Sequence, residues 1–314
     1  MEKEEQSLRD ISPNLNSTTG GLTFSAAVII YFAVMLFGAL LTIFLTAVCK
    51  VDEHSDLFLY LNYLCAPVAI TACISAVLKV RKIHPKYVFP VKCGSKYYVI
   101  AVLLIFGLLF SLSWLDSAVV EFFKLFGYKP RGAESYFPNL DGWRIIPAFL
   151  VIAVLPAVLE EALFRGVLLN CCERNMGTVR TVLVVGFCFS LFHASPEQTV
   201  YQFVAGCVFA LLAVRSGSIL PSVIMHFINN GIILVFAACN LFNESGNLNI
   251  SNTVNIILIV VGALSLIGGL IWLFLDKKPL IKCEKGGVKK FFMFASVGIA
   301  VLGLTWILSL FGVS

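Results

Sequence analysis

Long apolar stretches separated by short polar loops constrain this chain more than any other feature. Most of them reach the roughly 20 residues that an α-helix needs to cross a bilayer. In lipid every backbone polar group must be satisfied internally, and continuous apolar stretches of this length achieve that as helices. We therefore predict an all-α fold, a polytopic transmembrane helix bundle of about nine spans with an active site inside it. The spans cover approximately residues 23–48, 57–78, 97–115, 145–170, 179–194, 198–214, 219–241, 253–275 and 291–312.

The composition agrees with a membrane protein. Hydrophobic residues make up 59% of the chain and charged residues 13%, against roughly 45–50% and 25% in a soluble domain. The formal net charge of +5 comes from loop lysines, which set membrane orientation, so it does not indicate nucleic acid as a partner. The 10 cysteines form no CxxC motif and lie mostly within apolar spans. We interpret them as small buried apolar residues rather than a disulfide or zinc framework.

Two lysine-rich loops predict the orientation in the membrane. One loop follows the second span and the other follows the eighth, so a chain of nine spans places both on one side, which the positive-inside rule makes cytoplasmic. We expect a cytoplasmic N-terminus and an outer C-terminus in a multi-pass integral membrane protein, which in a bacterium would lie in the cell membrane. The basic residues are Lys79, Arg81, Lys82, Lys86, Lys92 and Lys96, then Lys277, Lys278, Lys282, Lys285, Lys289 and Lys290.

Three ionisable residues interrupt the fourth apolar stretch, namely Glu160, Glu161 and Arg165. Each ionised side chain near the bilayer centre costs at least about 2.5–3.5 kcal/mol on insertion scales. In a helix, Glu161 and Arg165 are i,i+4 neighbours that can form an ion pair, whereas Glu160 is turned about 100° away from Glu161. Pro156 removes a backbone donor and clashes with the carbonyl of Ile152, so we expect a kink there. The pattern favours a functional site, and a buried ion pair that only fixes helix packing is the alternative.

Two further spans carry polar residues that helical spacing places on one face. Phe189 and His193 share a face of the fifth span, and His226 and Asn230 share a face of the seventh. A single histidine in a membrane helix can simply bond a backbone carbonyl. Here, however, three spans together hold two histidines, two glutamates, an arginine and an asparagine. This grouping favours a single site.

These groups suit the hydrolysis of an acyl bond. Glu160 could take a proton from water as general base, with His193 orienting the same water. His226 and Asn230 could donate hydrogen bonds to the oxyanion. Ser190, one turn before His193, leaves a serine mechanism open as a less favoured route. If a metal is present, two histidines and a carboxylate can hold zinc, which makes Glu160, His193 and His226 the candidate ligands.

With these residues, the chain resembles the CPBP intramembrane proteases, also called the Abi family. That family includes the type II CAAX prenyl endopeptidases and the lysostaphin-resistance protein A-like proteins. Its motifs are Glu-Glu-x3-Arg, Phe-x3-His and His-x3-Asn, and the resemblance covers about residues 145–241. Here they read Glu160-Glu161-Ala-Leu-Phe-Arg165, Phe189-Ser-Leu-Phe-His193 and His226-Phe-Ile-Asn-Asn230.

The resemblance implies an intramembrane endopeptidase that cuts a membrane-associated or lipidated (CAAX-like) protein or peptide. It implies that Glu160 and His193 activate the water and that His226 and Asn230 form the oxyanion site. It also implies that Glu161 and Arg165 support these catalytic residues. We favour a mechanism without a cofactor, with zinc as the other possibility. Asn229 leaves open which amide faces the site, although spacing favours Asn230.

Four parts of the chain follow from this interpretation. We expect a polar cytoplasmic tail at 1–21, transmembrane helices and an outer loop at 22–143, a catalytic core at 144–242 and two further transmembrane helices at 243–314. The alternative function is a non-proteolytic membrane protein for bacteriocin immunity or partner binding. A proton-coupled transporter would show inverted repeats with paired broken helices, and the sequence shows none.

Overall fold

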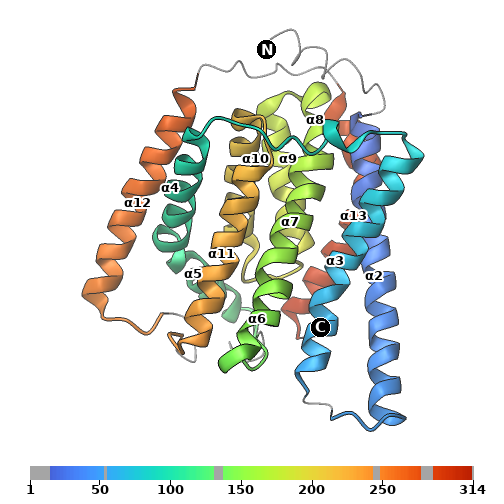
Figure 1. Cartoon of the computed structure of the whole chain (residues 1–314), viewed down its shortest axis with the longest axis vertical. Coiled ribbons are helices and arrows are strands. Elements are labelled where there is room, and N and C mark those ends of the chain that lie inside the picture. The colour runs from blue at the N-terminus through green and yellow to red at the C-terminus, as the bar shows by residue number, and fades with distance from the viewer. Residues whose placement is uncertain (1–14, 53–54, 131–136, 243–247, 277–285, 313–314) are drawn as a thin grey trace.

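The computed structural model describes residues 15–52, 55–130, 137–242, 248–276 and 286–312 (Figure 1). Over these residues the chain is helical, with a single isolated β-bridge between Phe242 and Leu248. Eight helical stretches are long and apolar enough to cross a membrane by length and composition. The remaining predicted span, the fifth in order, is a shorter apolar helix, Thr178–Phe192. The prediction of an all-α polytopic bundle is therefore confirmed.

The elements follow one another along the chain with short connections. The α-helices are α2 (Ser17–Ala47), α3 (Asp56–Val80), α4 (Lys96–Ser111), α5 (Ser113–Lys124), α6 (Ile145–Ala148), α7 (Leu155–Glu161), α8 (Leu169–Met176), α9 (Thr178–Phe192), α10 (Thr199–Ser216), α11 (Leu220–Ala238), α12 (Asn252–Phe274) and α13 (Gly287–Leu310). Two π-helical segments, η4 (Phe149–Val154) and η5 (Ala162–Leu168), join α6, α7 and α8 into one continuous run.

The third predicted span is shorter than expected. The structure ends α4 at Ser111 and begins α5 at Ser113, so the amphipathic stretch that follows the span forms a helix of its own. At this junction the indole nitrogen of Trp114 donates to the carbonyl of Ser111 at 2.9 Å. The helix α5 then contacts α10. The outer loop expected within residues 22–143 therefore begins with a helix.

The connection from α3 to α4 and the start of α13 lie at the same end of the bundle (Figure 1). The backbone nitrogen of Ser17 donates to Asn175 Oδ1 at 2.9 Å, and Gly287 packs against the backbone of Asn175. The starts of α2 and α13 and the end of α8 therefore meet, together with the connection from α3 to α4, while α13 ends at the opposite end (Figure 1). This arrangement agrees with the same-side placement expected for nine spans. The part of the tail before residue 15 and the stretch 277–285 lie outside the described residues.

The helices α9 and α10 form a hairpin that turns inside the bundle. At about 1.5 Å per residue, the 15 residues of α9 reach roughly 22 Å, less than the hydrocarbon thickness of about 30 Å. The turn is held by Ser190 Oγ, which donates to the carbonyl of Thr199 at 2.6 Å, and by Trp306 Nε1, which donates to Thr199 Oγ1 at 2.7 Å. The end of α9, where His193 lies, is therefore inside the bundle.

The run from α6 to α8 is not a single α-helix interrupted by a proline. Pro156 lacks an N–H group, so the carbonyl of Ile152 loses the donor that an α-helix would supply four residues later. The backbone widens into π-helix over η4 before the proline and again over η5 after the glutamates. Single π-helical turns within α-helices are frequent at functional sites. The short α7 between them carries both glutamates.

Glycines let several helices approach closely. A Cβ added at Gly107 of α4 would lie 2.5 Å from Leu266 Cβ of α12, and one at Gly262 would lie 2.8 Å from the backbone nitrogen of Ser111. Likewise a Cβ at Gly21 of α2 would collide with the carbonyl oxygen of Phe291 of α13. By contrast, a Cβ added at Gly268 would meet nothing within 4 Å. Close packing therefore depends on particular glycines and not on glycine content.

We expect Gly262→Val to destabilise the bundle by about 1–3 kcal/mol, because the added atoms force α12 away from α4. The matched control is Gly268→Val on the same helix, which should melt like the wild type. The measurement is the thermal unfolding midpoint of detergent-solubilised protein, with the yield of monodisperse protein as a second readout. Equal midpoints for the two variants would contradict this account of the α4–α12 contact.

Candidate active site

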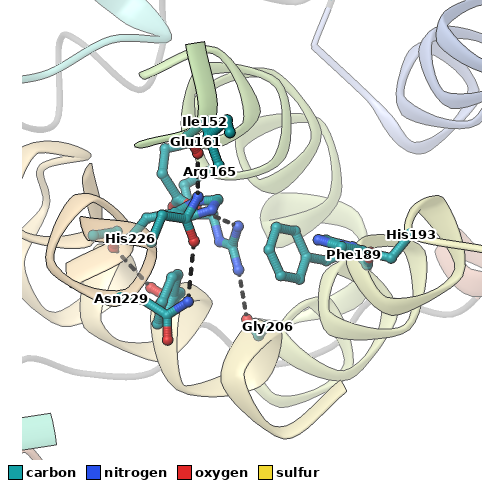
Figure 2. A network of polar contacts seen from close by, with 11 residues as sticks. Ile152, Glu161, Arg165, Phe189, His193, Gly206, His226 and Asn229 are labelled. Atoms are coloured by element: carbon teal, nitrogen blue, oxygen red, sulfur yellow. Dashed lines mark hydrogen bonds and ion pairs between the residues drawn. The ribbon is translucent and has the colours of Figure 1, made fainter. Parts of the chain in front are cut away.

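A fully buried ion pair lies at the centre of the site (Figure 2). Arg165 Nη1 donates to Glu161 Oε1 at 2.7 Å, and both side chains have no exposed surface. The i,i+4 pairing expected from the sequence is thus present. The same carboxylate oxygen lies 3.0 Å from Nδ1 of His226, and Arg165 Nη2 donates to the carbonyl of Gly206 at 3.0 Å. Glu161 and Arg165 therefore tie their own helix to α10 and α11.

Aromatic rings surround the guanidinium. Its central carbon lies 4.4 Å from the ring centroid of Phe189, 5.2 Å from that of Phe209 and 5.9 Å from that of Phe164. Cation–π contacts of desolvated groups are worth about 2 kcal/mol or more. These rings partly replace the water that an isolated arginine would lose on burial.

Phe189 also positions both histidines. Its ring lies between Arg165 and His193 (Figure 2), with ring centroids 4.8 Å from His193 and 5.9 Å from His226. The spacing Phe-x3-His therefore has a physical reason: one turn of α9 packs the phenylalanine on the arginine and supports the histidine at the end of the helix. Removing the ring would loosen three of the candidate residues together.

His193 has a defined tautomer when it is neutral. Its Nδ1 lies 2.8 Å from the carbonyl oxygen of Phe189. Because a carbonyl can only accept, Nδ1 carries the proton and Nε2 carries the lone pair. The side chain is half-buried. His193 can thus accept a hydrogen bond through Nε2 without losing its hold on the backbone.

Glu160 is turned away from the ion pair. It is half-buried, and its Oε2 is a buried oxygen without a hydrogen-bond partner among the described residues. Its charge lies within electrostatic reach of His193, Arg165 and Tyr31. A carboxylate oxygen that no side chain occupies can accept a proton or a hydrogen bond from a reacting group. The two adjacent glutamates therefore have separate environments, one paired and one available.

The two asparagines of α11 are joined to each other. Asn230 Nδ2 donates to the carbonyl of Ile152 at 3.2 Å, and its Oδ1 accepts from Asn229 Nδ2 at 3.0 Å. Asn229 Oδ1 accepts from the hydroxyl of Tyr201 at 3.1 Å. Of the two amides, that of Asn230 is the one directed at the helix of the glutamates. Asn229 instead donates to the Asn230 amide. The sequence had left open which of the two amides faces the site.

The zinc alternative requires at least three ligands grouped around one ion. Nδ1 of His226 faces Glu161 and Nδ1 of His193 faces a backbone carbonyl, so Nε2 is the nitrogen that each ring could offer to a metal. Among the described residues no three His, Cys, Asp or Glu side chains are grouped so that they could hold a metal ion. The candidate ligands Glu160, His193 and His226, all described, therefore do not converge on one point.

Three contacts of the site have no signal in the sequence motifs. The carbonyl of Gly206 holds Arg165, the ring of Phe209 covers both Arg165 and His226, and Tyr201 bonds Asn229. All three come from α10. The one usable signal is the small residue at 206: a Cβ there would lie 3.0 Å from the Cα of Gly186 on α9.

Comparison with known proteins gives two matches. Residues 142–232 match the family model described as type II CAAX prenyl endopeptidase Rce1-like. The chain is also similar to the membrane-embedded CAAX protease MroQ of Staphylococcus aureus (strain USA300). That similarity is 25% identity over 199 residues, which cover 60% of this chain and 77% of the relative. No solved structure matches the chain.

The matched segment begins just before α6 and ends within α11. It therefore contains the paired and unpaired glutamates, the arginine, both histidines and Asn230, and it includes the whole α9–α10 hairpin that places Phe189. The helices before α6 and after α11 lie outside the family match. Residues 142–232 are therefore similar to the type II CAAX prenyl endopeptidases, in agreement with the resemblance seen in the sequence motifs.

Proposed function

We propose that this protein is an intramembrane endopeptidase that hydrolyses a peptide bond with a water activated by Glu160. One observation carries the proposal. Oε1 of Glu161 pairs with Arg165 and contacts His226, whereas Glu160 has no ion pair among the described residues; Oε2 of each glutamate is buried without a protein partner. The similarity of residues 142–232 to the Rce1-like family supports peptide hydrolysis in general. The roles below are our assignment to individual residues.

The first step uses both acceptors. Glu160 accepts one proton of a water molecule, while Nε2 of His193 accepts a hydrogen bond from the other. The water oxygen attacks the scissile carbonyl carbon, and the electrons of the C=O double bond move to the carbonyl oxygen. The held proton then passes from Glu160 to the leaving nitrogen as the C–N bond breaks. Water is consumed and two peptide fragments are released, so atoms and charge balance.

The oxyanion needs donors at a fixed place. Asn230 Nδ2 has two N–H groups, of which the Ile152 carbonyl takes one. His226 uses Nδ1 toward Glu161 and can donate from Nε2 when it carries both protons, a charge that the Glu161 carboxylate offsets. Donors held in advance stabilise developing charge more than mobile water does. We assign the oxyanion site to these two side chains.

The substrate that suits this site is a peptide at or in the membrane. The catalytic groups lie within a bundle whose outer surface carries many exposed large hydrophobic residues, so a soluble protein would have to leave water to reach them. The relative MroQ bears the name of a CAAX protease. We therefore propose a membrane-associated or lipidated, CAAX-like peptide as substrate class.

Glu160→Gln should reduce cleavage by at least about 10²–10⁴-fold, because the amide cannot take the proton of water. The shape of the side chain is kept, so the unfolding midpoint should stay near that of the wild type. The assay is cleavage of a fluorogenic lipidated CAAX peptide and of a peptide library by purified protein. The matched control is Glu121→Gln, a carboxylate exposed on α5 and paired with Lys124, which should retain full activity. Full activity of Glu160→Gln would refute the proposed base.

Cleavage should continue in the presence of a strong chelator, because the proposed chemistry uses protein groups alone. The same peptide assay is run after dialysis against chelator, with and without added zinc. Activity that disappears with chelator and returns with zinc would replace the glutamate–water mechanism with a metal-dependent one.

Arg165→Met separates packing from catalysis. The substitution leaves the Glu161 carboxylate buried without its guanidinium, a loss of about 3–5 kcal/mol for a broken buried pair. We expect a large fall in the yield of folded protein, measured by size-exclusion chromatography. If the polar cluster served packing alone, as in an immunity or scaffold protein, Arg165→Met would show this loss while Glu160→Gln would leave the phenotype of the protein unchanged.

A further inference from the structure

A directional chain of hydrogen bonds links α10 to the helix of the glutamates. The hydroxyl of Tyr201 donates to Asn229 Oδ1 at 3.1 Å, Asn229 Nδ2 donates to Asn230 Oδ1 at 3.0 Å, and Asn230 Nδ2 donates to the Ile152 carbonyl at 3.2 Å. Tyr201 and Asn229 are each 9% exposed, so water competes little for these bonds. The chain crosses three helices and ends at a group proposed for the oxyanion site.

The direction of the chain follows from its last member. A backbone carbonyl can only accept, so Asn230 must present its NH₂ group to Ile152. The Oδ1 atom of Asn230 then lies on the other side and requires a donor, which is the NH₂ group of Asn229. The Oδ1 of Asn229 in turn requires a donor, which is the hydroxyl of Tyr201. A flip of either amide would bring two acceptors or two donors together.

Pro156 explains why the Ile152 carbonyl can serve as this anchor. A proline four residues later cannot supply the α-helical N–H, and the segment η4 that contains Ile152 is π-helical. The carbonyl, which lacks the α-helical donor, accepts a side-chain donor from α11. Pro156 and Asn230 therefore act on the same carbonyl: the proline withholds a backbone donor, and the asparagine supplies a side-chain donor.

We propose that Tyr201 and Asn229 are positioning residues that orient the Asn230 amide so that its second N–H faces the oxyanion. The inference rests on the proposed function and extends it to two residues outside the family's motifs. Neither residue touches substrate. Both act through Asn230: the Ile152 carbonyl sets the direction of its amide, and Tyr201 supplies the donor that satisfies the far end of the chain.

The first test is the kinetics of Tyr201→Phe with the fluorogenic peptide. We expect kcat to fall about tenfold with KM nearly unchanged, a smaller loss than the roughly 10²–10³-fold expected for removing an oxyanion donor with Asn230→Ala. The matched control is Tyr97→Phe, which should keep kcat. Tyr97 belongs to the same buried hydrophobic cluster as Tyr201, and its hydroxyl bonds Asp276 instead. A Tyr201→Phe enzyme with the kcat of Tyr97→Phe would overturn the proposal while leaving the proposed function intact.

Two further variants separate positioning from general packing. Asn229→Asp keeps an oxygen for Tyr201 but places its second oxygen against Asn230 Oδ1, so kcat should fall at least as far as in Tyr201→Phe. In an Asn230→Ala background, Tyr201→Phe should change kcat no further, because the group that it orients is gone. Losses that multiply in the double variant would assign Tyr201 an effect independent of Asn230 and overturn the proposal.

The second test needs no activity. The side-chain NH₂ signals of Asn230 are observed by NMR in protein labelled with ¹⁵N-asparagine and assigned by their loss in Asn230→Ala. We expect them to shift or broaden in Tyr201→Phe and to stay in place in Tyr97→Phe. If the wild type cleaves no peptide, the proposed function fails, and these spectra still decide whether Tyr201 orients Asn230: unchanged signals would refute it.

Discussion

The carboxylate of Glu161 is the interaction on which the rest of the site depends. One of its oxygens receives a guanidinium and an imidazole, and both of its partners and the carboxylate itself are buried. A buried charge without a partner is far more costly than a pair, so Glu161 cannot move without disrupting Arg165 and His226 together. That constraint fixes α7 against α11. Of the two adjacent carboxylates, only that of Glu161 is held in an ion pair among the described residues.

The polar groups are positioned by irregular backbone. Pro156 withholds the α-helical donor from the Ile152 carbonyl, which accepts instead from Asn230 of α11. The short α9–α10 hairpin turns where His193 lies. Non-helical backbone at membrane depth is tolerated where neighbouring elements satisfy it. The bonds from Ser190 to Thr199 and from Asn230 to Ile152 do so here. The same irregularities that a membrane helix normally avoids therefore place the candidate catalytic groups.

Sequence reasoning reached the features that local periodicity encodes. The apolar runs predicted the spans, and the i,i+4 spacing predicted that Glu161 pairs with Arg165 and that Glu160 does not. The contacts that periodicity does not encode were missed: the Gly206 carbonyl, the ring of Phe209 and the bond from Tyr201 all arise between helices. The break between α4 and α5 and the π-helical segments also lay beyond the pattern, because apolar composition does not distinguish one helical winding from another. The catalytic roles of these residues stay predictions.

The contact between the first and last helices sets an order for biosynthesis. Ser25 Oγ donates to the carbonyl of Phe294 at 2.8 Å across 269 residues of sequence, and Gly21 packs on Phe291 beside it. At roughly 5–20 residues per second, a ribosome needs about 13–54 s to make that interval. Throughout this time α2 is in the membrane without the partner that covers its small-residue face, held there by an apolar window of mean hydropathy 2.7. Closure by α13 is therefore a late event of assembly, and a nascent chain that stops before α13 keeps that face of α2 open to lipid.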